Sequence, residues 1–191
     1  TAAYALSGWM LEWTAGGTVV GRDGNRSRFA SPYGAFPCRG EDRWCTIACH
    51  DDQDWQRLVV EMGSPGWATD PRLSTLAGRK TAEDQIEEGV ARWTRGFERD
   101  ELFRRLQAAG LDAGIVETCA DLHQDPQLAH REHFVPMRHA VVGEHTVERL
   151  GYELSDTPAR IERPGPRLGE HGPEVWRDVL GLSDEEIGML E

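Results

Sequence analysis

Cysteine, histidine and aspartate side chains crowd into one short stretch of the sequence, residues 38–52. This stretch holds Cys38, Cys45, Cys49, His50, Asp51 and Asp52. Thiolates, imidazoles and carboxylates are the protein groups that bind zinc and iron, so a metal site is the first chemistry to consider. A structural zinc site usually combines two short Cys or His spacings, however, and no second pair follows this one.

The geometry of a strand also argues against a metal site. If residues 43–49 form a strand, Cys45 and Cys49 share one face and lie roughly 13 Å apart, at about 3.3 Å per residue. That distance is too long for both thiolates to bind one ion. We therefore predict no metal site and interpret these cysteines as small apolar residues of a core strand.

The same stretch predicts a β-hairpin followed by a helix. Apolar residues flank a polar turn at 39–43, and this turn contains the glycine that a tight reversal needs. His50 is then a boundary residue, and Asp51 or Asp52 caps the first turn of the helix, where a negative charge suits the helix dipole. Apolar residues recur with helical spacing until Gly63 ends the pattern. They are Trp55, Leu58, Val59 and Met62.

Composition bounds the classes of protein to consider. The chain of 191 residues is long enough for one large domain or two small ones, yet only 39% of it is hydrophobic. So low a content fits a protein piece that leaves some surface for another segment or partner to cover. The net charge of −12, from 33 acidic and 21 basic residues, disfavours nucleic acid or an anionic membrane as the main partner.

The sequence carries no sign of a membrane or secreted location. No apolar run approaches the roughly 20 residues that span a bilayer, and no charged and then apolar leader is visible. The 4 cysteines are irregularly spaced, unlike a disulfide framework, which agrees with a reducing compartment. We expect a soluble, cytoplasmic protein.

Short strands and helices alternate through the rest of the chain. In the first part of the chain we expect a helix over 1–15 and a long connection over 18–35. Further along we expect a helix from Thr81, where Thr81 and Asp84 form a capping box, a helix from Asp100 to Gly110, and a strand over 113–117. The last part should contain a helix at Asp125 and Pro126, an antiparallel pair over 135–142 and 147–152 around a turn at 143–146, a proline-rich linker over 155–166, and final helices from Gly172 and from Ser183. The predicted fold class is therefore α/β, with an α+β small domain of short antiparallel strands and several helices, followed by a C-terminal helical segment.

Five segments, in this order, resemble the C-terminal half of the class III CoA-transferases, the CaiB/BaiF family. They are EWTAGG with GNRS, SPYGAFPCRGEDRWCTIACHDDQDW, WATDPRLSTLAGR, ELFRRLQAAGLDAGIVETCADLHQDPQLAHR and PGPRLGEHGPEVWRDVLGLSDEEI. Each is weak alone, but together they cover nearly the whole chain. The family includes formyl-CoA and carnitine CoA-transferases and α-methylacyl-CoA racemases.

The resemblance implies a domain organisation. In the family, a small mixed domain is inserted into a Rossmann-like large domain, to which the final segment returns. Residues 1–30 would then be a helix and loop of the large domain, residues 31–154 the small domain, and residues 155–191 a linker and helices that dock on the large domain. Because family protomers interlock, we expect a homodimer or association with the N-terminal part of the enzyme.

The resemblance also implies a chemistry. In the family an aspartate attacks the acyl-CoA thioester, and CoA passes through an aspartyl-CoA intermediate to an acceptor carboxylic acid. That aspartate lies upstream of this chain in the family, so we assign no catalytic residue here and expect the chain alone to be inactive. The expected substrates are a coenzyme A thioester and a carboxylic acid, with no bound cofactor.

One segment is expected to contact substrate. The glycine-rich loop that covers the catalytic aspartate in formyl-CoA transferases aligns with the segment that begins at Ser31. The substrate-binding residues are therefore predicted to be Pro32, Tyr33, Gly34 and Ala35. This segment keeps only one glycine, which points to another branch of the family, and a plain turn before a strand also explains it. A racemase of the same family and a non-catalytic binding subunit of a split transferase remain the alternatives.

Overall fold

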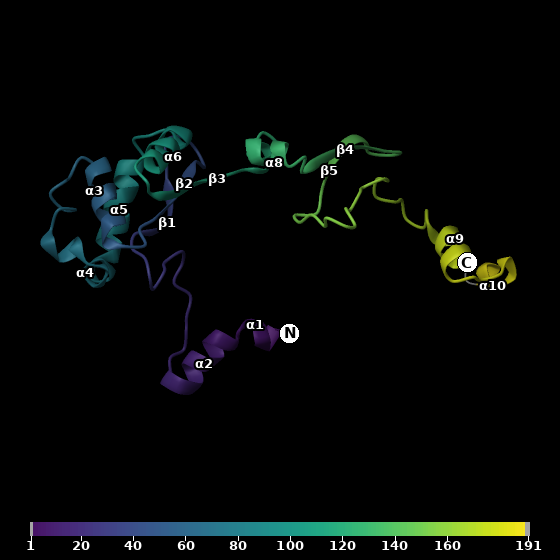
Figure 1. Cartoon of the computed structure of the whole chain (residues 1–191), viewed down its shortest axis with the longest axis horizontal. Coiled ribbons are helices and arrows are strands. Elements are labelled where there is room, and N and C mark those ends of the chain that lie inside the picture. The colour runs from purple at the N-terminus through teal and green to yellow at the C-terminus, as the bar shows by residue number, and fades with distance from the viewer. Residues whose placement is uncertain (1, 190–191) are drawn as a thin grey trace. The chain divides into compact units, whose positions relative to one another are not determined.

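The structure is a computed structural model that describes residues 2–189 (Figure 1). It divides the chain into two compact units, one that ends at Val116 and one that begins at Glu117. The domain boundaries that the sequence predicted, after residues 30 and 154, do not coincide with this division, and they stay a prediction. Helices combine with short antiparallel strands, which confirms the predicted mixed α and β class.

The chain begins with two short helices, α1 (Ala2–Ala5) and α2 (Ser7–Gly16). The helix predicted over 1–15 is therefore present from Ala2, with a break at Leu6, and Thr1 lies outside the described residues. Gly17 ends α2 in the left-handed conformation, at φ 67°, where glycine is favoured. No residue of α2 is buried. Among residues 2–189, no helix is both long enough and apolar enough to cross a bilayer.

The first unit is built around a three-stranded antiparallel sheet in the order β1-β2-β3, with β1 at one edge. Its strands are β1 (Tyr33–Pro37), β2 (Trp44–Ala48) and β3 (Asp112–Val116). The predicted hairpin is confirmed, and Gly40 takes a φ of 104° in its turn. The predicted strand at 113–117 is also present, and it pairs with β2.

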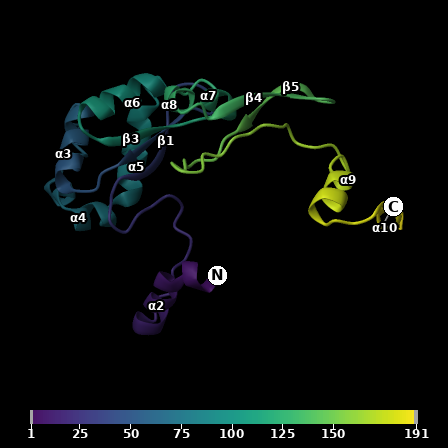
Figure 2. The same cartoon turned by 45° about the vertical axis from the view of Figure 1, so that its right-hand side comes forward.

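Three helices of the first unit share an apolar core with this sheet (Figures 1 and 2). They are α3 (Asp52–Glu61), α5 (Glu83–Thr94) and α6 (Arg99–Ala108). One apolar core joins their inner faces to the strands. It includes Phe36, Cys45, Ile47, Trp55, Leu58, Ile86, Val90, Leu102 and Leu106. Of the two predicted caps for α3, Asp51 is the one that accepts the N–H of Asp54, at 2.8 Å.

The predicted helix start at Thr81 is wrong. Thr81 instead ends α4 (Leu76–Thr81), a short helix that follows a 3-10 turn, η1 (Pro71–Ser74). Thr75 caps α4 by accepting the N–H of Gly78, and the Thr81 hydroxyl donates to the Gly78 carbonyl at 2.7 Å. The hydroxyl is therefore already engaged in the preceding helix, and α5 begins after Ala82 without a side-chain cap.

The second unit contains a two-stranded hairpin and several short helices. Its elements are α7 (Cys119–Leu122), α8 (Pro126–His130), β4 (Phe134–His139), β5 (Gly143–Glu148), α9 (Gly172–Glu174), the π turn η2 (Val175–Val179) and α10 (Asp184–Gly188). The helices predicted at Asp125 and from Ser183 are present, and these two residues cap them. Residues 155–166 form neither helix nor strand.

The turn of the second hairpin is not where the sequence predicted it. The turn falls at 140–142, and residues 143–146 belong to β5. The ring of His139 explains the shift, because its Nδ1 accepts the backbone N–H groups of Val141 at 3.1 Å and Val142 at 3.0 Å. The glycine expected within the turn, Gly143, starts β5 at φ 84°.

The buried thiols lead to a labelling prediction. Cys38, Cys45 and Cys49 are buried, whereas Cys119 is exposed. Burial raises the pKa of Cys45 and of Cys49 to about 12 each, and it also raises the pKa of Cys38. Because the thiolate is the reactive form, we expect N-ethylmaleimide to label one thiol of the native chain and all 4 after denaturation, as counted by intact mass.

The same shifts fix how stability depends on pH. In the denatured chain these thiols ionise at the ordinary pKa of 9.0, whereas in the folded chain they ionise only at a higher pH. The folded state therefore binds more protons above that pH, and its free energy of unfolding should fall as pH rises. Rapid labelling of a second thiol in the native chain would contradict the burial on which both statements rest.

Candidate functional site

The segment predicted to contact substrate joins the long connection to β1. Ser31 and Pro32 are fully buried, Tyr33 is 39% exposed, and Gly34 and Ala35 are half-buried. Pro32 can therefore shape this segment but cannot reach a ligand from the surface. Tyr33, Gly34 and Ala35 are the three of the four predicted residues that a ligand could contact.

A buried arginine anchors the start of this segment. Arg79, at the end of α4, is 0% exposed, and its guanidinium packs over the ring of Trp55 at 5.8 Å from the ring centroid. A buried charge is tolerated only where its donors find partners. Its partners are Ser31 O at 2.7 Å, Asp52 Oδ1 at 2.9 Å, Leu73 O at 3.2 Å and Asp51 O at 3.3 Å. Arg79 thus ties the segment to α3 and η1.

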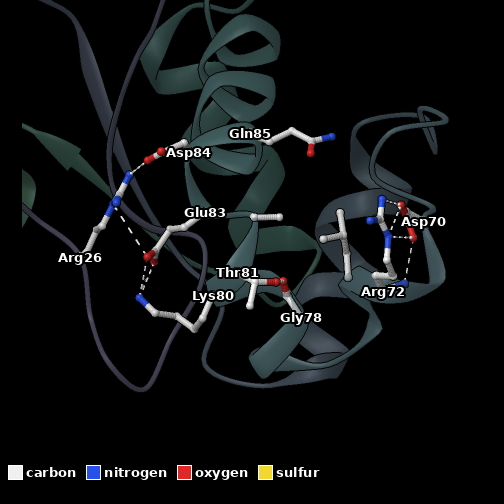
Figure 3. Close-up of a pocket in the computed structure, with 11 residues that line it drawn as sticks. Arg26, Asp70, Arg72, Gly78, Lys80, Thr81, Glu83, Asp84 and Gln85 are labelled. Carbon is white, nitrogen blue, oxygen red and sulfur yellow. Dashed lines mark hydrogen bonds and ion pairs between the residues drawn. The ribbon is translucent and has the colours of Figure 1, made fainter.

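Ion pairs hold the long connection against α5. Arg26 donates to Glu87 at 2.8 and 2.7 Å and also pairs with Asp84, while the neighbouring Ser27 carbonyl accepts from Lys80 at 2.9 Å. Figure 3 shows Glu83 between the two cations, 2.6 Å from Lys80 and 3.8 Å from Arg26. Hydrogen bonding to Glu87 and Asp84 raises the pKa of Arg26 above its ordinary value. We call this group the Arg26 clamp.

A cavity of about 430 Å³ lies beside the clamp (Figure 3). Three basic residues line it, and each is paired with a carboxylate. Arg72, for example, binds Asp70 at 2.6 Å, and its hydrogen bonds hold the pKa of Asp70 below its ordinary value. Because these charges are already balanced, the cavity is poorly suited to capturing a phosphate.

A second cavity, of about 260 Å³, contains the predicted residues Tyr33, Gly34 and Ala35. Its other walls come from the connection at 23–26 and from Glu87 and Ala91 of α5. Gly34 lies beside Asn25, and even an added Cβ at this position would be at ordinary contact distance, 3.7 Å from the Cβ of Asn25. The GNRS motif and the predicted substrate segment therefore meet at one cavity.

Tyr33 also borders a histidine at the end of the sheet. Its ring meets that of His50 edge-on, with centroids 6.4 Å apart, and His50 Nε2 lies 2.9 Å from Asp112 Oδ2. Within residues 2–189, no three His, Cys, Asp or Glu side chains gather as a metal site would require. The ring of this histidine is bound by a carboxylate at the surface, and its backbone N–H donates to Asp54 Oδ2 at 3.0 Å.

Two positioning residues were missed from the sequence, Arg79 and Arg26. Arg79 closes the motif WATDPRLSTLAGR, but a single arginine after a glycine gives no sign that it is buried. A signal did exist for Arg26, because Glu83, Asp84 and Glu87 present one acidic face of a predicted helix. An arginine in a long connection is a natural partner for such a face.

Comparison with known proteins gives consistent matches. The model of CoA-transferase family III matches residues 1–172. A succinyl-CoA–D-citramalate CoA-transferase of Chloroflexus aurantiacus is 29% identical over 94% of this chain and 44% of its own length. The alpha subunit of a succinyl-CoA–L-malate CoA-transferase from Chloroflexus aurantiacus is 31% identical over 91% of this chain and 40% of its own length.

A solved structure shares the fold. A CaiB/BaiF family protein from Brucella suis matches with a TM-score of 0.77 at 24% identity, over 92% of this chain and 45% of that one. The chain thus spans less than half the length of each of these proteins.

Proposed function

The chain belongs to CoA-transferase family III, and we propose that it forms part of an enzyme that moves CoA from an acyl-CoA thioester to a carboxylic acid. The observation that carries this proposal is the family match over residues 1–172, nearly the whole chain. The names of two relatives suggest succinyl-CoA as donor and a hydroxylated dicarboxylic acid as acceptor.

The chemistry divides between this chain and the rest of the enzyme. The proposed nucleophile is an aspartate outside these residues. Its carboxylate attacks the thioester and forms an acyl anhydride as the CoA thiolate leaves, and the thiolate then attacks the aspartyl carbonyl, which releases the donor acid and leaves an aspartyl-CoA thioester. The acceptor carboxylate displaces CoA from this thioester in the same way, and the thiolate then attacks the acceptor carbonyl and frees the aspartate. A carboxylate is a weak nucleophile in water, so it must be desolvated and its transition state stabilised by fixed dipoles. We propose that the segment from Pro32 to Ala35 covers this aspartate and excludes water from it. Arg79 and the Arg26 clamp hold the segment in place.

The proposal includes a partner that supplies the rest of the family fold. Large apolar side chains of the first helices and the loop after them are exposed, namely Leu6, Trp9, Met10, Leu11, Trp13 and Val19. Apolar surface of this extent marks an interaction site. Assembly with the N-terminal part of the enzyme, in one chain or between two, would cover it. A dimeric state and a cytoplasmic location belong to the same proposal.

The test is CoA exchange between succinyl-CoA and L-malate or D-citramalate. The 191-residue chain alone should give neither product nor a covalent mass change. The same chain assembled with the N-terminal part of the enzyme should give both product and a CoA adduct on an aspartate of that part. An adduct on the isolated chain would place the nucleophile within it and contradict the division proposed here.

The alternatives give different results in the same samples. A racemase would exchange the α-proton of a 2-methylacyl-CoA with deuterated solvent without transferring CoA. A non-catalytic binding subunit would assemble with its partner, yet a complete transferase would work equally well without it.

A further inference from the structure

The backbone of β1 directs half of its polar groups away from the sheet. In an antiparallel pair, alternate residues exchange hydrogen bonds with the partner strand, and the residues between them point outward. Cys49 donates to the Pro32 carbonyl at 2.9 Å and Cys38 donates to Arg43 at 2.7 Å, so the even-numbered residues of β1 bind β2. The odd-numbered residues therefore present their N–H and C=O groups at the open edge.

The protein covers both ends of this edge with its own groups. Ser31 O accepts from Arg79 at 2.7 Å, Pro37 O accepts from the Thr94 hydroxyl at 2.7 Å, and Arg39 N donates to Phe97 O at 2.8 Å. Between them stand Tyr33 and Ala35. Within residues 2–189, no hydrogen bond is made to the outward N–H and C=O groups of these two residues.

The uncovered part of the edge opens on the cavity of about 260 Å³, which Tyr33, Gly34 and Ala35 line. Backbone N–H and C=O groups are strong hydrogen-bonding groups, so the outward groups of Tyr33 and Ala35 can pair with a molecule that binds in this cavity. The cavity is smaller than the roughly 300–1,000 Å³ of a site for a whole drug-sized ligand. It is suited to one section of a longer molecule.

We propose that the edge of β1 at Tyr33 and Ala35 binds the pantetheine arm of the CoA thioester, with a secondary amide of the arm paired to the strand as an added strand would be. The inference rests on the proposed function. Pantetheine is an extended, uncharged chain with two secondary amides, and a strand edge offers the matching donors and acceptors. Its lack of charge suits a cavity whose basic residue, Arg26, is already paired with Glu87.

The length of the open edge favours this short arm over a peptide. The edge is free only from Tyr33 to Ala35, roughly 7 Å at 3.3–3.4 Å per residue. A peptide strand pairs over a mean of about 5–6 residues, and the contacts from Arg79 and Thr94 would block it at both ends.

The test is an NMR titration of the full 191-residue chain, labelled with ¹⁵N, with reduced pantetheine at millimolar concentration. The amide signals of Tyr33 and Ala35 should shift, together with those of residues 23–26. Ala35→Pro removes the outward N–H without removing a bond to β2, and proline is tolerated at such edge positions. It should weaken pantetheine binding roughly five-fold, the effect of one hydrogen bond, whereas the matched Ala35→Ser, which keeps the N–H, should not.

Two results would overturn the inference. One is the absence of shifts at Tyr33 and Ala35 in the unsubstituted chain, which does not depend on the folding of any variant. The other is equal or tighter binding of a blocked alanine dipeptide at the same amides. CoA exchange by the assembled enzyme is measured separately, so the inference can fail while the proposed transfer reaction stands, or the reverse.

Discussion

Replacing Arg79 with methionine should lower the free energy of unfolding by about 3 kcal/mol, because carbonyl oxygens in a buried site lose their donors at a cost of about 1–3 kcal/mol each. Methionine keeps most of the volume and the contact with Trp55. Asp52 contributes little to this loss, since its side chain is 55% exposed and water can solvate it again. Urea denaturation followed by tryptophan fluorescence measures the difference.

The control for this prediction lies seven residues earlier in the chain. Arg72 also pairs with an aspartate, Asp70, but its side chain is 85% exposed, so Arg72→Met should change stability little. Arg79→Lys should fall between the two, because one ammonium group cannot reach four oxygens in different directions. Equal stabilities for the methionine variants at 72 and 79 would show that the buried contacts are not a significant source of stability.

The same substitution bears on the candidate site. Arg79 binds the carbonyl of Ser31, and the next residue, Pro32, accepts the N–H of Cys49. Loss of the arginine should therefore speed amide hydrogen exchange more in Ser31 and Cys49, whose N–H groups bind Cys49 O and Pro32 O, than in α6. Uniformly faster exchange would indicate global destabilisation alone.

Local signals in the sequence were sufficient where the structure is itself local. The hairpin between β1 and β2 spans a turn of a few residues with a glycine in it, and Asp51 caps the helix that starts at the next residue. Gly63 and Gly110 end α3 and α6 in left-handed conformations, at φ 78° and 75°. Each of these features depends on residues within one or two turns, so pattern and propensity identify them.

The missed features depend on contacts between distant residues. Arg79 reaches Ser31, 48 residues away, and Arg26 reaches Glu87, 61 residues away. No periodicity records such pairs. The shifted turn of the second hairpin has a different cause. The sequence pattern placed the turn at the glycine, but the ring of His139 accepts two backbone N–H groups and fixes the turn just before it. The prediction that Pro32 to Ala35 bind substrate came from the family resemblance alone. The structure adds that three of these four residues line one cavity.

Gly78→Ala is the second substitution expected to have a large effect, and two physical terms oppose each other there. Gly78 lies within α4, where intrinsic helix propensity favours alanine over glycine by about 1 kcal/mol. A Cβ at this position would lie 2.8 Å from the carbonyl carbon of Arg72 and closer still to its oxygen. Both atoms belong to the backbone of η1, so no side chain can rotate away to make room.

The steric term should prevail, with a loss of about 2–3 kcal/mol in the free energy of unfolding, the upper part of the range of about 1–3 kcal/mol for overpacked sites. Gly8→Ala is the matched control, because Gly8 also lies in a helix but has nothing within 4 Å of the place that a Cβ would occupy. It should be neutral or stabilising by up to about 1 kcal/mol. If Gly78→Ala also proved stabilising in urea denaturation, η1 would have to move away from α4. Because η1 supplies the Leu73 carbonyl to Arg79, that movement should appear as faster hydrogen exchange around the buried guanidinium.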